Sequence, residues 1–362
     1  MKLGIVGLPN SGKTTLYNAI LQTGAVASNY PFSTINPNIG SVPIPDDRLA
    51  KLAEVFKPKQ TTPTAIEMVD IAGLVRGASK GEGLGNRFLS HIREVDALVH
   101  VVRCFEDENV THVYNNINPV RDVETVELEL VLSDLELIER RHEKISKMAR
   151  TDRSYKREEE ILSTIKETLE DGRAARTLKW DDADDIRIVE GIPLISLKPV
   201  LYAANVSEES LTAIDSRQKK LSDFVALQNA KMYVSCAKLE AEVAEFDADE
   251  RELFLKEAGI DENGLIRLIK AGYELLGLVS FFTGGPKEVR AWAIRHGLKV
   301  PHAAGKVHSD MERGFIRAEV IPWDELVNFG SYNAAKEKGM VRIEGKEYVV
   351  KDGDVVFVRF NV

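Results

Sequence analysis

The first residues of the chain have the types and spacing that hold a nucleotide phosphate. The segment Gly7-Leu8-Pro9-Asn10-Ser11-Gly12-Lys13-Thr14 fits the pattern G-x-x-x-x-G-K-[ST]. Its glycines let successive backbone N–H groups turn inward around phosphate oxygens, and the helix that follows adds the positive end of its dipole. Lys13 is expected to reach the β- and γ-phosphates, and the Thr14 hydroxyl to ligate Mg²⁺. The predicted phosphate-binding residues are Asn10, Ser11, Gly12, Lys13, Thr14 and Thr15.

A second motif, Asp70-Ile71-Ala72-Gly73, ends an apolar segment further along the chain. D-x-x-G at such a place supplies a carboxylate that holds Mg²⁺ through water and a glycine N–H that meets the γ-phosphate. The glycine-rich segment 74–86 then predicts a switch loop that the γ-phosphate orders, with a plain flexible linker as the alternative.

A second hydroxyl ligand for Mg²⁺ is expected from the loop after the first helix. The candidates are Ser28, Ser33 and Thr34. Thr34 is favoured because Pro31 and Pro37 brace the chain around it, although these residues also suit an ordinary turn.

The residue after D-x-x-G predicts slow hydrolysis. Signalling GTPases generally place a glutamine there to orient the attacking water, whereas this chain has Leu74, which cannot form a hydrogen bond. His112 is a candidate substitute, and a surface histidine without chemistry is the alternative. Asn10 could help to hold a monovalent cation such as K⁺ near the phosphates, or could only form hydrogen bonds within its loop.

The base-reading motif is altered. Guanine is normally recognised by N-K-x-D, whereas the equivalent place here reads Asn205-Val206-Ser207-Glu208. The Asn205 carboxamide could accept from the exocyclic amine of adenine, so ATP is predicted over GTP. The remaining base-contacting loop is predicted at Ser235, Cys236 and Ala237. The alternative is that the altered motif is only a helix N-cap with an acidic first turn.

Near-continuous apolar segments predict the strands that position these motifs. They cover 2–6, 65–71, 96–104, 197–205 and 231–236, with a helical pattern at 13–21 after the phosphate loop. Such strands alternating with helices indicate an α/β fold with a mostly parallel sheet covered on both faces.

About ninety residues between the third and fourth strands are predicted as an inserted antiparallel helical hairpin. Val131, Leu135, Ile138, His142 and Ile145 recur at steps of four and three, and Ile161, Ile165 and Leu169 form a second stripe. The tip is basic, which fits either RNA contact or a solvated helix face. Its cations are Arg140, Arg141, Lys144, Lys147, Arg150, Arg153, Lys156 and Arg157.

From about residue 281 the pattern changes to short alternating segments, at 314–321, 340–343, 348–350 and 354–360. This predicts a β-rich domain with one or two helices, at 289–296 and 323–329. The predicted domains are therefore 1–118 with 196–280, the insert 119–195, and 281–362.

The composition of the chain restricts its expected partners and cellular compartment. The net charge is −9, which argues against nucleic-acid binding by the whole surface while leaving room for a local basic patch. No apolar run approaches the length that a membrane span needs, and we expect no signal peptide. Cys104 and Cys236 are the two cysteines, too few for a disulfide framework, so a reducing cytoplasm is expected.

Taken together, these segments resemble the YchF / Obg-like ATPase family of P-loop NTPases. The resemblance spans the whole chain and rests on GLPNSGKTT, NYPFSTINPN, DIAGLVRGASKGEGLGN, NVSE and AGKVHSDMERGFIRAEVI. It implies a Ras-like domain, a helical-hairpin insert and a C-terminal β-grasp TGS domain. It also implies ATP preference, ribosome association, Thr34 as a Mg²⁺ ligand, Val206 as a base contact and His112 as a catalytic substitute.

Three functional hypotheses remain at this point. The first is an ATP-hydrolysing switch that acts on the translation machinery, and the second is a GTPase of the same fold. The third is a nucleotide-gated RNA- or ribosome-binding adaptor, using the basic hairpin tip and the TGS domain, in which hydrolysis is incidental. No membrane partner is expected under any of them.

Overall fold

A computed structural model describes residues 1–27, 38–71, 84–257 and 264–361. Thr34, Gly73 and Leu74, together with Ser28 and Ser33, lie outside the described residues. The chain packs into two compact units. The described residues 1–23, 38–40, 67–71, 84–257 and 264–265 form the first, and residues 24–27, 41–66 and 266–361 form the second.

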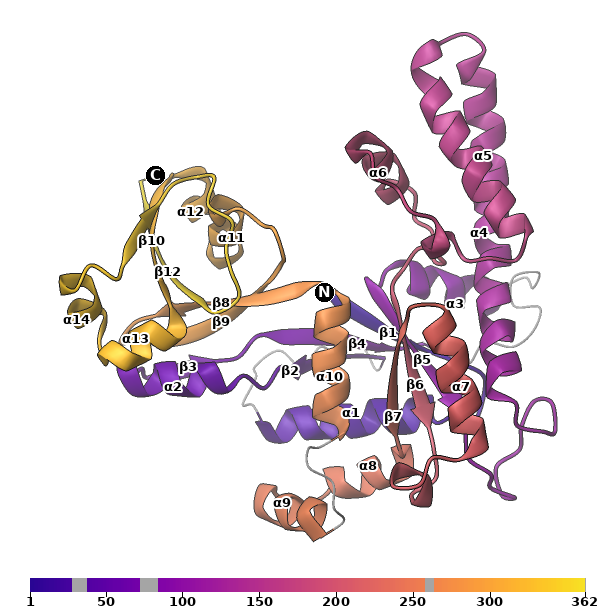
Figure 1. Ribbon diagram of the computed structural model, residues 1–362, viewed down its shortest axis with the longest axis horizontal. Helices are drawn as coiled ribbons and strands as arrows, with labels where there is room; N and C mark the ends of the chain where they lie inside the picture. The colour runs from indigo at the N-terminus through magenta and orange to yellow at the C-terminus, as the bar shows by residue number, and fades with distance from the viewer. Residues whose placement is uncertain (28–37, 72–83, 258–263, 362) are drawn as a thin grey trace. The chain divides into compact units, whose positions relative to one another are not determined.

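The first of two six-stranded sheets has the order β2-β4-β1-β5-β6-β7, and its strands β1, β5, β6 and β7 lie wholly within the first unit (Figure 1). Its strands are β1 (Lys2–Val6), β2 (Ile39–Pro43), β4 (Ala65–Asp70), β5 (Ala97–Arg103), β6 (Val200–Asn205) and β7 (Lys231–Ser235). The pairs β4–β1, β1–β5, β5–β6 and β6–β7 are all parallel. Every residue of β5 and β6 is buried, as expected for strands covered on both faces. The five predicted strands are confirmed, and β2 was not predicted.

Helices cover this sheet. The first-unit helices are α1 (Lys13–Ala27), α3 (Leu84–Arg93), α4 (Pro119–Ala149), α5 (Lys156–Glu170), α6 (Ala183–Glu190), α7 (Ser216–Leu227), α8 (Ala237–Ala244) and α9 (Ala248–Glu257), and α10 (Gly264–Leu275) begins at its end. One core joins α3, α4 and α7 to the sheet through Ile92, Val126 and Leu221. Because neighbouring strands are parallel, their carboxyl ends meet at one edge, where the nucleotide motifs converge.

The predicted helical insert is confirmed. Helices α4 and α5 run side by side as a hairpin (Figure 1). Val131, Ile138 and Ile145 of α4 share a buried core with Ile161 and Ile165 of α5. At the base of the hairpin, Asn118 caps α4 and Pro119 occupies its first turn.

The second unit is a mixed sheet with the order β11-β10-β12-β8-β9-β3. Its strands are β3 (Gln60–Thr62), β8 (Leu278–Gly284), β9 (Glu288–Arg295), β10 (Phe315–Pro322), β11 (Arg342–Glu344) and β12 (Asp354–Phe360). Its helices, besides most of α10, are α2 (Asp47–Phe56), α11 (Val300–Val307), α12 (Ser309–Arg313), α13 (Trp323–Phe329) and α14 (Tyr332–Glu337). The predicted helix at 323–329 and the strand at 354–360 are confirmed.

The predicted helix at 289–296 is wrong. These residues lie in β9, which pairs antiparallel with β8 along its whole length. The turn at 285–287 folds the two strands into a hairpin, and Val289 and Ala291 lie in a core while Arg290 between them is half-buried. The predicted strand at 348–350 is reduced to one bridge, between Lys299 and Val349.

Residues 41–66 belong to the second unit, which the sequence did not indicate. Leu49 and Leu52 of α2 pack in one core with Phe282 and Val355. Strand β3 pairs parallel with β9 at the edge of the sheet. Among helices of the described ranges, none has the length and apolar run that crossing a bilayer requires.

Candidate nucleotide site

The phosphate loop joins β1 to α1, and its backbone requires glycine at two places. Gly7 has φ +152° and Gly12 φ +94°. A Cβ on Gly7 would lie 2.4 Å from the Val101 carbonyl oxygen, and one on Gly12 would lie 2.2 Å from the Asn205 amide nitrogen. The loop is therefore packed against the ends of β5 and β6, and only glycine fits the pattern there.

Lys13 is held inside this loop. Its Nζ donates to the Leu8 carbonyl oxygen at 2.7 Å, and the residue is 6% exposed. Burial lowers the pKa of Lys13 to about 8, although the nearby Asp70 carboxylate raises it. A buried ammonium that donates to a carbonyl oxygen is a suitable receptor for phosphate charge.

Thr14 and Asp70 form the metal-binding side of the site. The Thr14 hydroxyl donates to Asp70 Oδ2 at 3.0 Å, and Asp70 Oδ1 is buried without a hydrogen-bond partner. A hydroxyl beside an unsatisfied carboxylate oxygen fits Mg²⁺, which prefers oxygen ligands and takes few from the protein. Within the described ranges, no three His, Cys, Asp or Glu side chains cluster as a larger metal site would require.

Asn205 has a structural role that differs from the predicted one. Its Nδ2 donates to the Ser11 carbonyl oxygen at 2.9 Å, and its Oδ1 accepts from the Ala237 backbone N–H at 2.9 Å. The amide therefore ties the phosphate loop to the start of α8, and both of its polar atoms already have partners. This geometry does not fit Asn205 as the acceptor for an adenine amine.

Of the other residues predicted to contact the nucleotide base, some are buried and some are exposed. Val206 is 1% exposed and packs in the sheet core, which leaves little of it for a base. Ser235 accepts the Val206 N–H through its carbonyl, and burial raises the pKa of the Cys236 thiol. Glu208 is exposed, and its carboxylate has no hydrogen bond or ion pair in the part of the chain described here.

Asn10 contacts the loop that follows β5. With φ +60°, it donates from Nδ2 to the Thr111 carbonyl oxygen at 3.1 Å and to the Thr111 hydroxyl at 3.3 Å. This is the loop hydrogen bonding that the sequence left open as the alternative to cation binding. Thr15 is exposed at the start of α1.

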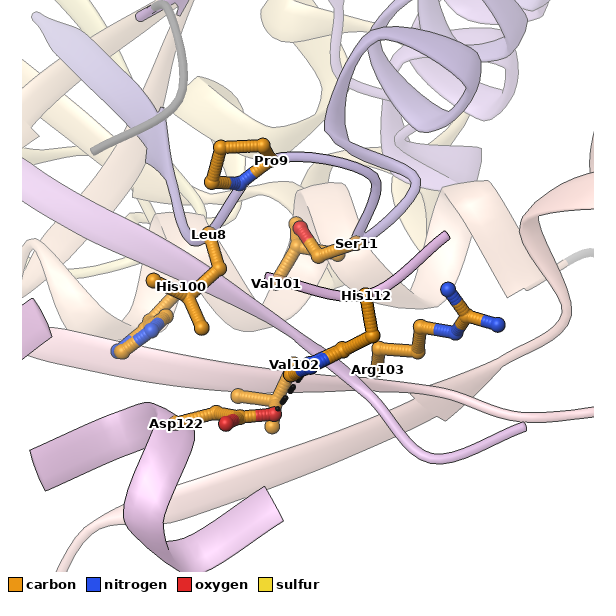
Figure 2. A pocket seen from close by; sticks show the side chains of 9 residues that line it. All are labelled: Leu8, Pro9, Ser11, His100, Val101, Val102, Arg103, His112 and Asp122. Atoms are coloured by element: carbon orange, nitrogen blue, oxygen red, sulfur yellow. Dashed lines mark hydrogen bonds and ion pairs between the residues drawn. The ribbon is translucent and has the colours of Figure 1, made fainter. Parts of the chain in front are cut away.

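The side chain of His112 is buried although the residue as a whole is half-buried, which does not match the surface histidine that the sequence left open. Its Nε2 lies 2.9 Å from Asp122 Oδ2, and its Nδ1 accepts from the Tyr114 N–H at 3.2 Å. The two side chains are 5% and 6% exposed. Figure 2 shows the ring directed at Asp122, beside a void of about 10 Å³ that Ser11 and His100 also line.

Two residues of this region were missed by the sequence analysis. Asp122 lies in the first turn of α4, and Arg103 ends β5 with its guanidinium on the carbonyls of Phe105, Asp107 and Val110. Arg103 is 3% exposed, and burial lowers its pKa. The available signal in the sequence was Arg103 itself, a charged residue at the end of a mostly apolar strand.

Comparisons with known proteins identify the families and relatives that this chain resembles. A family model for a C-terminal YchF-GTPase domain, described as a protein of unknown function, matches residues 278–361. A second, described as 50S ribosome-binding GTPase, matches residues 2–134. The chain is 52% identical to the ribosome-binding ATPase YchF of Bacillus subtilis over 99% of both chains. It is 47% identical to the protein of that name from Escherichia coli O157:H7 over 100% of this chain and 99% of the other.

Two solved structures are also similar to this chain. The structure of the Schizosaccharomyces pombe YchF GTPase matches with a TM-score of 0.90 and 34% identity, over 99% of this chain and 97% of that one. A GTP binding protein from Pyrococcus horikoshii matches with a TM-score of 0.64 at 18% identity, which supports the fold alone.

Proposed function

The chain belongs to the YchF family, and from this premise we propose that it is a cytoplasmic, ribosome-associated ATPase that uses Mg²⁺ and acts as a slow nucleotide switch. The observation that carries the proposal is a pair of buried polar groups beside the phosphate loop. One is the Lys13 ammonium, which donates to the Leu8 carbonyl oxygen. The other is Asp70 Oδ1, which is buried beside Thr14 without a hydrogen-bond partner. A bound Mg²⁺–nucleotide would give Lys13 a phosphate partner and would satisfy the Asp70 carboxylate.

In the proposed mechanism the residues of the chain position the phosphates. Lys13 and the phosphate-loop amides stabilise negative charge on the transferred phosphoryl group. Thr14 and Thr34 would hold Mg²⁺ directly and Asp70 through water, while the Gly73 N–H would meet the γ-phosphate. Bound Mg²⁺ would neutralise negative charge on the phosphates. His112 would orient water, and its replacement by alanine should lower the turnover number while affinity is kept.

Base selection is proposed to rest on Glu208 and on the backbone at Cys236 and Ala237. Glu208 is exposed, and its negative charge adds to the effect of burial in raising the pKa of the Cys236 thiol. The test is titration of the full chain with ATP and GTP in Mg²⁺, with K⁺ and then with Na⁺. ATP should bind at least about tenfold more tightly, a difference of about 1.4 kcal/mol. Tighter GTP binding would show instead that this is a GTPase with an altered reader loop.

The K⁺ and Na⁺ arms of the same titration and turnover assay test the cation role proposed for Asn10. If K⁺ increases turnover, Asn10→Ala should remove the increase. Equal rates in both salts would leave Asn10 with its contact to Thr111 alone.

A second candidate function, RNA contact by the hairpin, is favoured by the charge of its tip. Arg140, Arg141, Lys147 and Arg157 form ion pairs with acidic neighbours. The remaining four cations are exposed and form no ion pair with another described residue: Lys144, Arg150, Arg153 and Lys156. Such a cluster suits a phosphate backbone.

Ribosome binding tests this second function. Changing Lys144, Arg150 and Arg153 to glutamine should weaken ribosome association and flatten its dependence on salt, whereas ATPase activity without ribosomes stays unchanged. The matched control changes Arg140, Arg141 and Lys147, which already have acidic partners. Equal losses in both variants, or none in the first, would remove the hairpin tip from the interface.

A further inference from the structure

His112 lines a small void with Leu8 and Ser11 of the phosphate loop, and both of its ring nitrogens contact other residues. The Tyr114 N–H donates to Nδ1, so Nδ1 carries a lone pair and the proton of the neutral ring is on Nε2. Nε2–H then donates to Asp122 Oδ2 at 2.9 Å. Since both nitrogens have partners inside the protein, the ring has no free acceptor with which to orient a water molecule.

Asp122 is itself fixed from the opposite side. Its Oδ1 accepts from Arg121 Nη2 at 2.8 Å and Arg121 Nε at 3.1 Å, so the carboxylate keeps its position at the base of α4. Arg121 in turn stacks over the Tyr114 ring at 4.4 Å. The acceptor for His112 is therefore part of a preorganised cluster and does not depend on the histidine.

The loop that carries His112 is attached to the nucleotide site. Arg103 binds its carbonyls at Phe105, Asp107 and Val110, and Asn10 of the phosphate loop donates to Thr111, the residue directly before His112. A shift of the phosphate loop on nucleotide binding would therefore act on the backbone that immediately precedes the histidine.

We propose that Asp122 is a positioning residue that holds His112 in this resting orientation, and that the Asn10–Thr111 contact links release of the ring to the nucleotide. The proposal rests on the catalytic role proposed for His112. Basal hydrolysis is slow because most molecules keep the histidine on Asp122, and turnover rises when the ring leaves it and presents a free nitrogen to water.

Single-turnover and steady-state ATPase rates of the full chain test this. Asp122→Ala should raise the basal turnover number by about tenfold, as expected when one charge-assisted hydrogen bond no longer favours the resting state. Asp122→Asn keeps an acceptor oxygen and should return the rate toward the original. Affinity for ATP should be unchanged in both, and Glu124→Ala, an exposed carboxylate on the same helix, is the matched control.

A double-substitution cycle separates this proposal from the one on which it rests. In a His112→Ala background, Asp122→Ala should have no effect on rate. If His112→Ala alone leaves the rate unchanged, the catalytic role of the histidine fails. If His112→Ala lowers the rate and Asp122→Ala lowers it too, the histidine is catalytic but Asp122 orients it for reaction, and the resting role is wrong.

A spectroscopic readout covers the case in which Asp122→Ala does not fold. In the ¹⁵N-histidine-labelled full chain, the His112 ring should show the Nε2–H tautomer without nucleotide. The Nε2–H signal should lose its hydrogen-bonded shift when a non-hydrolysable Mg²⁺–ATP analogue binds, and Asn10→Ala should weaken that change. An unaltered ring signal with analogue bound, at saturation and with ribosomes present, would overturn the proposal.

Discussion

At the residue scale, the nucleotide site depends on polar groups that the sheet edge buries. His100 is one such group, in the middle of β5, and it is 3% exposed with its ring 5.7 Å from that of Tyr202. Burial, with smaller contributions from Arg176 and Lys13, lowers the pKa of His100 to about 3. The histidine is therefore neutral in the folded chain across the physiological range.

This gives a prediction for stability against pH. An unfolded histidine binds its proton near pH 6.5, whereas folded His100 does not until about pH 3. Between these values the unfolded state binds more protons, so the free energy of unfolding falls as pH falls, by up to about 1.4 kcal/mol per pH unit. The free energy of unfolding, measured with denaturant at several pH values from 4.5 to 7, should change less with pH in His100→Phe than in the original chain. An identical slope in both chains would assign the acid sensitivity to other groups.

A second prediction at this scale concerns Asn205. Because its amide bridges Ser11 and Ala237, Asn205→Ala should loosen the phosphate loop without altering the base-reading surface. Affinity for ATP and for GTP should fall by a similar factor, about tenfold for the loss of two buried hydrogen bonds. The ratio of the two dissociation constants is the measurement, with Glu208→Gln as the variant expected to change it. If Asn205→Ala changed the ratio of the ATP and GTP dissociation constants, Asn205 would contact the base after all.

At the element scale, one carboxylate anchors the helical hairpin to the first unit. Asp134 of α4 is fully buried and accepts from the backbone N–H groups of Ile195 and Ser196 and from the Ser196 hydroxyl. Burial raises the pKa of Asp134, and the hydrogen bonds from Ser196 and Ile195 oppose that rise. The chain returning from the insert to β6 is held by this contact.

Asp134→Ala should therefore lower the free energy of unfolding by about 3 kcal/mol, since it leaves three buried donors without their acceptor. Asp134→Asn, which keeps one carbonyl oxygen, should cost less. Urea unfolding followed by far-ultraviolet circular dichroism measures both, and Glu136→Ala, an exposed carboxylate on the same helix, is the control. A loss as small as that of the control would mean that Asp134 does not anchor the hairpin.

The same scale shows what the sequence could and could not predict. Strands such as β5 are buried on both faces, so they appear in the sequence as near-continuous apolar runs. The phosphate loop is a local motif that its residue spacing alone defines. The segment at 289–296 mixes Ala, Arg and Trp, which suit either a helix or a strand, and only its pairing with β8 decides the outcome. The contact between His112 and Asp122 joins a loop to a helix start, so no local pattern encodes it.

At the scale of the whole molecule, the two units do not follow the order of the chain. Residues 41–66 belong to the second unit, although they lie between Thr34 and Asp70, both proposed for the metal site. This segment contributes Leu49 and Leu52 to the core around Phe282. The C-terminal β domain therefore cannot complete its core from residues after 265 alone.

Arg48 provides a polar contact between residues 41–66 and the C-terminal segment of that unit, and it gives the last prediction. Its guanidinium binds Asp46 and Asp352, and Asp352 also accepts from the Ser280 N–H of β8. The Arg48 side chain is 24% exposed and that of Asp352 50%, so solvent weakens the pair. Arg48→Ala should lower the stability of the second unit by about 1–2 kcal/mol, through lost hydrogen bonds and lost packing on Phe282.

Hydrogen exchange of the full chain localises this effect. Amides of β8 and β12 should exchange faster in Arg48→Ala, while those of β5 in the first unit stay protected. The control is Lys299→Ala, which removes an exposed ion pair with Glu347 made within the C-terminal segment. If only α2 loses protection and β8 behaves as in the control, residues 41–66 are a surface addition to a domain that is stable without them. Faster exchange in α2, β8 and β12 together would show that they unfold as one unit with residues 41–66 inside it.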